Sequence, residues 1–198
     1  MDIANGLHDV PPGKVAMVVT HLQMTAPAPL RPAPEADGIT LRQVAADVAW
    51  YRDIFDRVGR DWLWFGRRRM PDAELAALLR DEGIELHTLR RDGVDEALLE
   101  LDFRKEGECE LAYFGLTPAL VGSGAGRLLM NEAITRAWAR PIRRFHVHTC
   151  TLDSPQALDF YIRSGFVPYR RQVEIEDDPR LSGLLPQGSA PHVPVLGP

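Results

Sequence analysis

The stretch from Glu108 to Met130 constrains the fold more than any other, because it joins a β-rich run to a helical pattern through a glycine-rich turn. The turn consists of Val121, Gly122, Ser123, Gly124, Ala125 and Gly126. The first backbone N–H groups of a helix have no partner within the helix, and the helix dipole adds positive potential there. The turn therefore predicts a binding site for an anion, most simply a phosphate group.

The glycine pattern alone leaves two other interpretations open. A glycine-rich turn between a strand and a helix is often only a tight connection. It can also belong to a dinucleotide-binding fold, although the Gly-x-Gly-x-Gly order from Gly122 to Gly126 differs from the Gly-x-Gly-x-x-Gly order favoured there.

Composition limits the class of protein that carries this turn. The chain has 198 residues, of which 45% are hydrophobic, and this indicates one compact core in a single domain. Its net charge of −5 argues against a nucleic-acid-binding protein, which needs a basic surface. Cys109 and Cys150 lie far apart in no metal-binding or Cys-x-x-Cys spacing, so neither a disulfide framework nor a bound metal is expected.

Membrane and export signals are not expected either. The first ten residues lack the basic and apolar regions of a signal peptide, and no run reaches the roughly 18 apolar residues of a membrane span. We therefore expect a cytoplasmic protein that does not bind a membrane.

The first half of the chain predicts one strand followed by helices. Residues 14–24 contain a β-branched run that suits a strand, and the Pro-rich residues 24–38 are expected to form a surface loop. Apolar residues recur at three and four positions from Leu41 to Val58, which predicts an amphipathic helix ending at Gly59. A short helix that begins at Pro71-Asp72 follows.

The second half predicts an antiparallel meander and then a crossover through a helix. The expected strands are residues 84–90, 94–103, 108–117 and 145–149. A helix is expected after the glycine turn and another over residues 154–164, with Ser154 as its N-cap. Residues 187–198 have the composition of a loose tail. This order predicts an α/β protein with a mixed sheet, in which the strands on either side of the glycine turn run parallel.

Two motifs in this order resemble the GNAT superfamily of acyl-CoA-dependent N-acyltransferases. The first is the turn, which follows the family's Gln/Arg-x-x-Gly-x-Gly/Ala pattern except that Val121 replaces the polar residue. The second follows the pattern Asn-x-x-Ala-x-x-x-Tyr-x-x-x-Gly-Phe, with Ser154 in place of asparagine and matches at Ala157, Tyr161, Gly165 and Phe166. The resemblance covers roughly residues 99–169 and implies a GNAT-like, mostly antiparallel central sheet flanked by helices.

The resemblance also implies acetyl-CoA as the co-substrate, with no metal. The pyrophosphate of the coenzyme would lie on the turn, with Ser154 beside it. The pantetheine arm would hydrogen-bond the end of the preceding strand at Phe114, Gly115 and Leu116. Tyr161 would donate a proton to the departing thiolate, for which a phenol with a pKa near 10 is roughly matched.

Direct attack by an amine also requires a base. Glu110 is the first candidate, because it stands on the strand before the turn and alternates onto the face of Ala112 and Phe114. Glu100 and His148 are the alternatives. A bulge in the strand would reverse this facing.

Further polar and aromatic groups have simpler structural interpretations. We expect Trp62 and Trp64 to pack in the core or a cleft wall, with a substrate-facing role as the alternative. Arg67–Arg69 are expected to be a solvated run, with contact to an acidic substrate or the 3′-phosphate of the coenzyme as the alternative. His146 and His148 share a strand face, which would permit metal binding. Because the spacing places no third ligand beside them, a polar strand surface is favoured. Four acidic residues gather near the end of the chain: Glu174, Glu176, Asp177 and Asp178. We expect them to form a solvated strand edge or a collar that attracts a cationic amine.

We therefore predict an acetyl-CoA-dependent N-acetyltransferase that modifies a primary amine by direct transfer. A small amine or amino-acid-like metabolite is favoured as the acceptor over a protein N-terminus or lysine. The alternative is a non-catalytic acyl-CoA-binding module, against which Tyr161 argues, since binding alone needs no acid. An exposed edge strand near Val173 would allow a homodimer.

Overall fold

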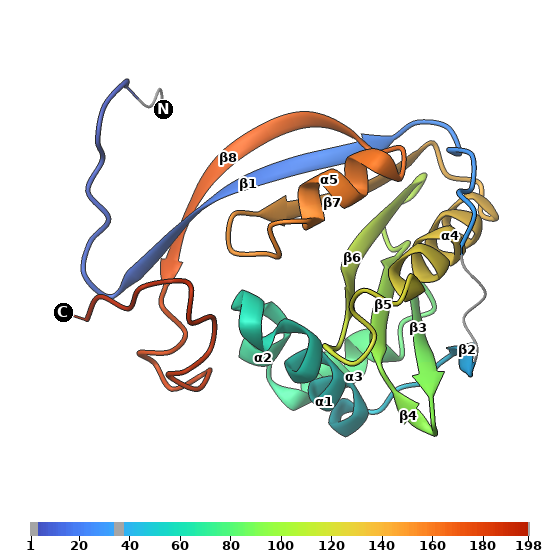
Figure 1. The fold of residues 1–198 in the computed structure, drawn as a ribbon, viewed down its shortest axis with the longest axis horizontal. Helices are drawn as coiled ribbons and strands as arrows, with labels where there is room; N and C mark the ends of the chain where they lie inside the picture. The colour runs from blue at the N-terminus through green and yellow to red at the C-terminus, as the bar shows by residue number, and fades with distance from the viewer. Residues whose placement is uncertain (1–3, 34–37, 198) are drawn as a thin grey trace.

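The computed structural model describes residues 4–33 and 38–197, which form a mixed sheet of eight strands with helices on both faces (Figure 1). The strands are β1 (Lys14–Met24), β2 (Ile39–Gln43), β3 (Ile84–Arg91), β4 (Val94–Asp95), β5 (Ala97–Asp102), β6 (Glu108–Leu116), β7 (Arg144–Cys150) and β8 (Val167–Asp177). The helices are α1 (Val48–Gly59), the 3-10 helix η1 (Arg60–Trp62), α2 (Gly66–Arg69), α3 (Asp72–Leu79), α4 (Ala125–Trp138) and α5 (Ala157–Arg163). The predicted α/β class, with a mostly antiparallel sheet, is confirmed.

The sheet has the order β2-β3-β5-β6-β7-β1-β8, with β4 paired to β3 alone. All adjacent strands are antiparallel except β6 and β7, which run parallel on either side of α4, as predicted. These two strands pair from Glu108 with Arg144 to Glu110 with His146, and beyond that point they diverge (Figure 1). The divergence opens the sheet in its middle, directly before the glycine turn.

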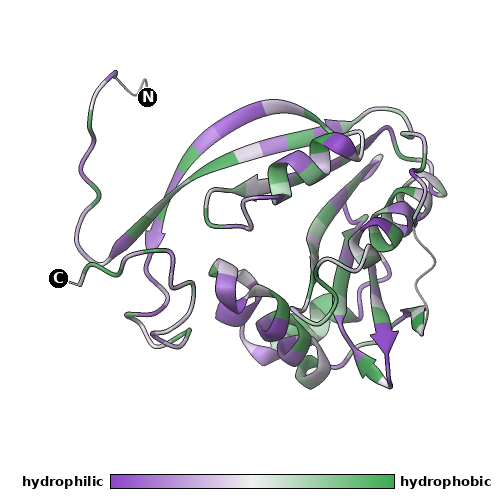
Figure 2. Cartoon of the chain, viewed as in Figure 1, coloured by the Kyte–Doolittle hydropathy of each residue, from purple (hydrophilic) through white to green (hydrophobic). Residues whose placement is uncertain are grey.

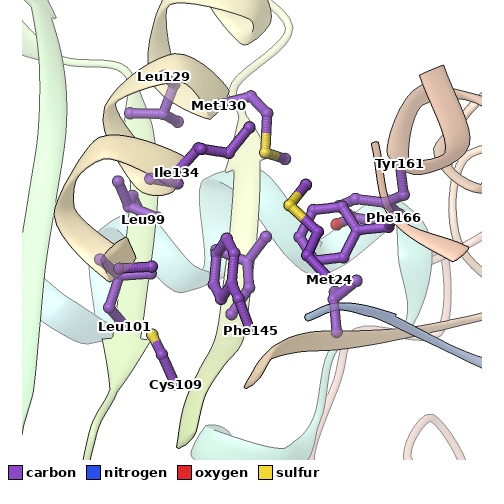
Figure 3. Close-up of a cluster of buried hydrophobic side chains, with 14 of the residues drawn as sticks. Met24, Leu99, Leu101, Cys109, Leu129, Met130, Ile134, Phe145, Tyr161 and Phe166 are labelled. Atoms are coloured by element: carbon purple, nitrogen blue, oxygen red, sulfur yellow. The ribbon is translucent and has the colours of Figure 1, made fainter. Parts of the chain in front are cut away.

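Two hydrophobic clusters show which helices cover which face of the sheet. On one face, α4 contributes Leu129, Met130 and Ile134, which pack against residues of β5 and β7 such as Leu101 and Phe145 (Figure 3). On the other face, α1 and α3 pack against β3 and β5. Removal of these apolar side chains from water supplies the main driving force for folding. In contrast, much of the edge strand β8 is hydrophilic (Figure 2).

The predicted helix over residues 41–58 is wrong in its first part. Ile39–Gln43 forms β2 and pairs with β3, so that Leu41 lies opposite Leu89. The helix begins only at Val48, where the Asp47 side chain accepts a hydrogen bond from the Trp50 N–H at 2.8 Å. Asp47 is thus an N-cap signal that outweighs the apolar periodicity before it. The predicted end at Gly59 is confirmed.

The prediction of a loose tail over residues 187–198 is also wrong for the part nearest β8. Ser189 and Ala190 are buried, and the buried Arg180 donates hydrogen bonds to the carbonyl oxygens of Ser189, Ala190 and Val193. Arg180 is held in turn by Asp178 at 2.7 Å. Composition cannot reveal such a segment, because its order comes from one arginine that satisfies several carbonyl groups.

The Pro-rich residues 25–33 carry no regular secondary structure, and residues 34–37 of the predicted loop lie outside the described part of the chain. The loop is tied to α4, since the Asn131 side chain donates a hydrogen bond to the Arg31 carbonyl at 2.8 Å. Within residues 4–33 and 38–197, no helix is long and apolar enough to cross a membrane.

Candidate active site

A cavity of about 540 Å³ lies at the opening between β6 and β7, and its lining includes residues of helices on both faces of the sheet, such as Val58 of α1 and Gly126 of α4. One end, the turn end, is lined by the glycine turn, the start of α4, and α5. The other, the tryptophan end, is lined by Met17, Trp62, Leu63, Trp64, Phe65 and Leu152. The last residues of β6, from Leu111 to Leu116, line the cavity between the two ends.

The turn end presents backbone donors to the cavity. Gly124 precedes α4 with φ of +85°, a left-handed conformation that glycine adopts without strain. No hydrogen-bond acceptor within the described residues is found for the backbone N–H groups of Gly122, Gly124 and Gly126. Because α4 also directs its dipole at this point, the turn can hold an anion.

The predicted turn residues differ in their access to the cavity. Val121, Gly122, Gly124 and Gly126 line it. In contrast, Ala125 is buried, and the Ser123 hydroxyl donates to the Leu120 carbonyl at 2.7 Å. Ser123 and Ala125 therefore shape the turn rather than line the cavity with their side chains.

Two arginines that sequence reasoning missed add positive charge to the turn end. Arg127 follows Gly126 in the first turn of α4, and Arg163 ends α5; both line the cavity. The Arg127 Nε is buried and has no hydrogen-bond partner in the described chain. An arginine next to a glycine-rich turn is a sequence signal that could have been used.

Ser154 lines the cavity but does not cap a helix as predicted. The α5 helix begins at Ala157, and residues 154–156 form a turn in which the Ala157 N–H bonds to the Ser154 carbonyl at 2.8 Å. Ser154 followed by Pro155 is a residue pair that favours a helix start, but in the structure these residues form part of the turn between β7 and α5. The prediction of Ser154 as the N-cap is therefore wrong, and Gln156 holds that position.

Tyr161 lies on α5 and lines the cavity. It is only 7% exposed and packs edge-on against Phe114 and Phe166, with ring centroids 6.3 and 5.9 Å apart (Figure 3 labels Tyr161 and Phe166). Burial raises the pKa of the phenol far above its ordinary value. The hydroxyl is therefore protonated at neutral pH.

The predicted facing of Glu110 is wrong, because β6 contains a bulge. Leu111 pairs with Leu101 and Tyr113 with Glu100, so Ala112 is an extra residue between them. The bulge places Glu110 on the face of Tyr113, opposite that of Phe114. Glu110 itself does not line the cavity, although Tyr113 on the same face does.

Glu110 instead contacts His148 of β7, which does line the cavity. The Glu110 Oε1 lies 3.7 Å from the His148 Nδ1. The carboxylate raises the pKa of His148, burial opposes this, and Asp153 and Glu174 act in the same direction as Glu110. The pKa of Glu110 is lowered, chiefly by the same imidazole. The two residues therefore form a pair in which each favours the charged form of the other.

Glu100, the third candidate for the base, does not line the cavity. It is 0% exposed, accepts a hydrogen bond from the Tyr51 hydroxyl and pairs with Arg67 at 2.5 Å. Arg67 is only 17% exposed in its side chain, so the predicted solvated arginine run is wrong at this residue. A buried carboxylate with two such partners is structural.

Replacing Tyr51 by phenylalanine should therefore lower the free energy of unfolding by about 1–3 kcal/mol, because the buried Glu100 carboxylate loses one of its donors. Urea denaturation would measure the change. Tyr169→Phe, which removes an exposed phenol, is the control and should be neutral. Equal stability of the Tyr51 variant and the wild type would show that the hydroxyl does not support Glu100.

The tryptophan end is held together by contacts that cross the opening of the sheet. The Trp64 indole N–H donates to the Asp153 carboxylate at 3.1 Å, which links the segment after η1 to the β7–α5 loop. Gly59 and Gly115 allow this position, since a Cβ on either would lie within 3.2 Å of Trp64 side-chain atoms. The expectation that Trp62 and Trp64 form a cleft wall is confirmed.

The acidic residues of β8 have separate roles rather than forming one solvated edge. Glu174 lines the cavity, while Glu176 pairs with Arg69 of α2 at 3.2 Å. Asp177 pairs with Lys14, and Asp178 is buried against Arg180. The prediction of a solvated edge is therefore wrong for Asp178.

The two histidines of β7 each lie beside one carboxylate. His146 Nε2 is 3.4 Å from Glu108, and its pKa is lowered by burial. Over residues 4–33 and 38–197, no three His, Cys, Asp or Glu side chains gather in an arrangement able to hold a metal ion.

Comparison with known proteins identifies the family. The sequence profile of the acetyltransferase (GNAT) family matches residues 51–166, more than half of the chain. The chain belongs to the GNAT family. The matched region of this GNAT protein contains the glycine turn, β6, Tyr161 and Gly165-Phe166, so the resemblance drawn from these motifs is confirmed. No curated protein matches the GNAT chain.

Solved structures of other acetyltransferases share its fold. A GCN5-related N-acetyltransferase from Sphaerobacter thermophilus is 16% identical with a TM-score of 0.60 over 96% of this chain and 55% of that one. One from Kribbella flavida is 18% identical with a TM-score of 0.57, over 86% of this chain and 63% of that one. An aminoglycoside acetyltransferase from an uncultured soil metagenomic sample, in complex with sisomicin, is 13% identical with a TM-score of 0.53. The match covers 65% of this chain and 88% of that one. The GNAT chain thus spans less than two thirds of the first two proteins.

Proposed function

We propose that this GNAT protein transfers the acetyl group of acetyl-CoA to a primary amine of a small molecule. The observation that carries the proposal is one cavity lined by the glycine turn, Tyr161 and His148, whose imidazole Nδ1 lies 3.7 Å from the Glu110 carboxylate. Each of the three supplies one requirement of direct acetyl transfer: coenzyme binding, an acid and a base.

The residues of the turn end fit acetyl-CoA. Free N–H groups of Gly122, Gly124 and Gly126 would receive the pyrophosphate, with Arg127 and Arg163 adding charge. The strand residues Phe114, Gly115 and Leu116 line the path between the turn and Tyr161, where the pantetheine arm would lie. When bound, the coenzyme supplies an acetyl thioester.

Tyr161 acts as the general acid in this proposal. As the amine nitrogen bonds to the acetyl carbon, the carbon–sulfur bond breaks and the thiolate takes the phenolic proton. Burial raises the pKa of the phenol, so Tyr161 carries this proton at neutral pH but is a weaker acid than the value near 10 expected from the sequence.

His148 accepts the proton that the attacking nitrogen loses, and Glu110 positions the imidazole and favours its charged form. This assigns a role to Glu110 that differs from direct proton abstraction, because His148 lines the cavity and Glu110 does not. Only neutral imidazole can accept a proton, so the rate of transfer should rise with pH through the raised pKa of His148.

Glu110→Gln should move this rise in rate to lower pH. The substitution removes the carboxylate that raises the pKa of His148, while burial, which lowers it, remains. The neutral imidazole is then present at lower pH. The dependence of kcat/KM on pH would measure the shift.

Glu108→Gln is the matched control, because Glu108 lies on the same face of β6 but beside His146. Its profile should keep the wild-type midpoint. A Glu110→Gln profile that moves to higher pH, or stays in place, would contradict the assignment of the base.

The alternative is a module that binds acyl-CoA without transferring the acyl group. Tyr161 and the His148–Glu110 pair favour the enzyme, since neither group is needed to bind the coenzyme. Acetyl-CoA binding is tested by thermal stabilisation and transfer by release of CoA in the presence of amines. Stabilisation without any CoA release would support the module.

A further inference from the structure

The tryptophan end of the cavity is mainly apolar and aromatic. Its wall combines β1, the η1–α2 segment and the β7–α5 loop. Three of its residues, Met17, Leu63 and Leu152, also belong to one buried hydrophobic cluster. An acceptor that enters this end removes apolar surface from water on both partners, which favours an acceptor with an apolar body.

The charged groups at this end favour an ammonium group. Glu174 lies opposite Met17 in the β1–β8 pairing and lines the cavity, and its carboxylate makes no ion pair or hydrogen bond with any residue of the described chain. With Asp153, it adds negative potential around His148. Such a field raises the local concentration of a cationic amine.

The same end offers no free positive side chain for a carboxylate, as far as the described residues show. Arg69 is paired with Glu176 at 3.2 Å and stacks on the Phe65 ring at 4.8 Å. Arg127 and Arg163 belong to α4 and α5 at the turn end. A carboxylate beside the reacting amine would lose its hydration without gaining a partner, which is costly.

The C-terminal segment supports the wall of the tryptophan end. Leu63 packs in one cluster with Leu185 and Ala190, and the Trp62 ring lies 5.7 Å from the His192 ring. Residues 185–192 therefore pack behind Leu63 and Trp62 at the tryptophan end. A wall supported in this way, around a cavity of about 540 Å³, suits a small molecule better than a polypeptide.

We propose that the acceptor is a small primary amine on an apolar, flat body that carries no carboxylate, the chemical class of the arylalkylamines. This proposal rests on the proposed acetyl transfer and narrows it. It disfavours amino acids, which were among the acceptors expected from the sequence, and it disfavours polycationic sugars and polyamines, whose polar groups the apolar wall would leave without partners.

The test compares acceptors with the wild-type protein and saturating acetyl-CoA, once thermal stabilisation has shown that acetyl-CoA binds. 2-Phenylethylamine and phenylalanine form a matched pair that differs by one carboxylate, and spermidine and kanamycin represent polycations. We expect kcat/KM for 2-phenylethylamine to exceed that for each of the others by at least about tenfold.

Two results would overturn the proposal in distinguishable ways. Faster acetylation of phenylalanine, spermidine or kanamycin would contradict the acceptor class and leave acetyl transfer intact. If acetyl-CoA binds but no amine is acetylated, the proposed transfer fails and the acceptor class with it.

Glu174→Gln tests the electrostatic part separately. We expect KM for 2-phenylethylamine to rise by up to about fivefold, the effect of one partly exposed charge, while KM for acetyl-CoA stays unchanged. Glu74→Gln, on the exposed surface of α3, is the control. An unchanged KM for the amine in Glu174→Gln would contradict the role of Glu174.

Discussion

Tyr161→Phe is expected to lower kcat by about 10²- to 10⁴-fold while leaving the affinity for acetyl-CoA unchanged. The phenylalanine ring can keep the contacts with Phe114 and Phe166, so the cavity retains its shape. What is lost is the only proton that we assign to the departing thiolate. Steady-state kinetics would give kcat, and thermal stabilisation by acetyl-CoA would give the affinity.

Tyr169→Phe removes a phenol outside the cavity and should retain full activity. Wild-type turnover in Tyr161→Phe would remove Tyr161 from the mechanism. Loss of acetyl-CoA binding in this variant would instead mean that the tyrosine has a binding role.

Gly126→Val should abolish stabilisation by acetyl-CoA. A Cβ at this helical position lies 3.6 Å from Leu116 and 3.9 Å from Phe160, so the first added atom fits and the branches of valine extend into the turn end. Valine is no worse than glycine in a helix, and the free protein should therefore fold. At a ligand concentration 100 times Kd, the stabilisation that disappears is about 2.7 kcal/mol.

Thr135→Val introduces the same side chain at an exposed position of α4 and should leave acetyl-CoA binding unchanged. Differential scanning fluorimetry with and without acetyl-CoA compares the two variants. Full stabilisation of Gly126→Val by acetyl-CoA would show that the coenzyme does not approach the turn closely.

The strands and the crossover were predictable because their signals are local. The Asp-Gly turn, the β-branched runs and the glycine turn each act within a few residues, and they specify β3 to β7 and the parallel pair. The strand β2 was missed because its order comes from pairing with β3, which lies more than 40 residues away. The same holds for the segment after β8, which Arg180 fixes through distant carbonyl groups.

The glycine turn and the strand before it could be predicted as part of one site because they lie in one stretch, from Phe114 to Gly126, whereas Arg127 and Arg163 at the same end were missed. The choice among Glu110, Glu100 and His148 could not be made from the sequence, because the bulge at Ala112 changes the facing of Glu110 and only the folded sheet brings it beside His148. The tryptophan end could not be predicted from local sequence patterns either. Its wall combines Met17, Trp64 and Glu174, which come from distant parts of the chain.

The central claim is acetyl transfer from acetyl-CoA to an amine in the cavity between β6 and β7. Mass spectrometry of the wild-type protein incubated with acetyl-CoA and a panel of primary amines tests it most directly. We expect an N-acetylated amine and free CoA in equal amounts, and neither product with the Gly126→Val variant. Free CoA without an acetylated amine, or no product from any amine although acetyl-CoA binds, would contradict it.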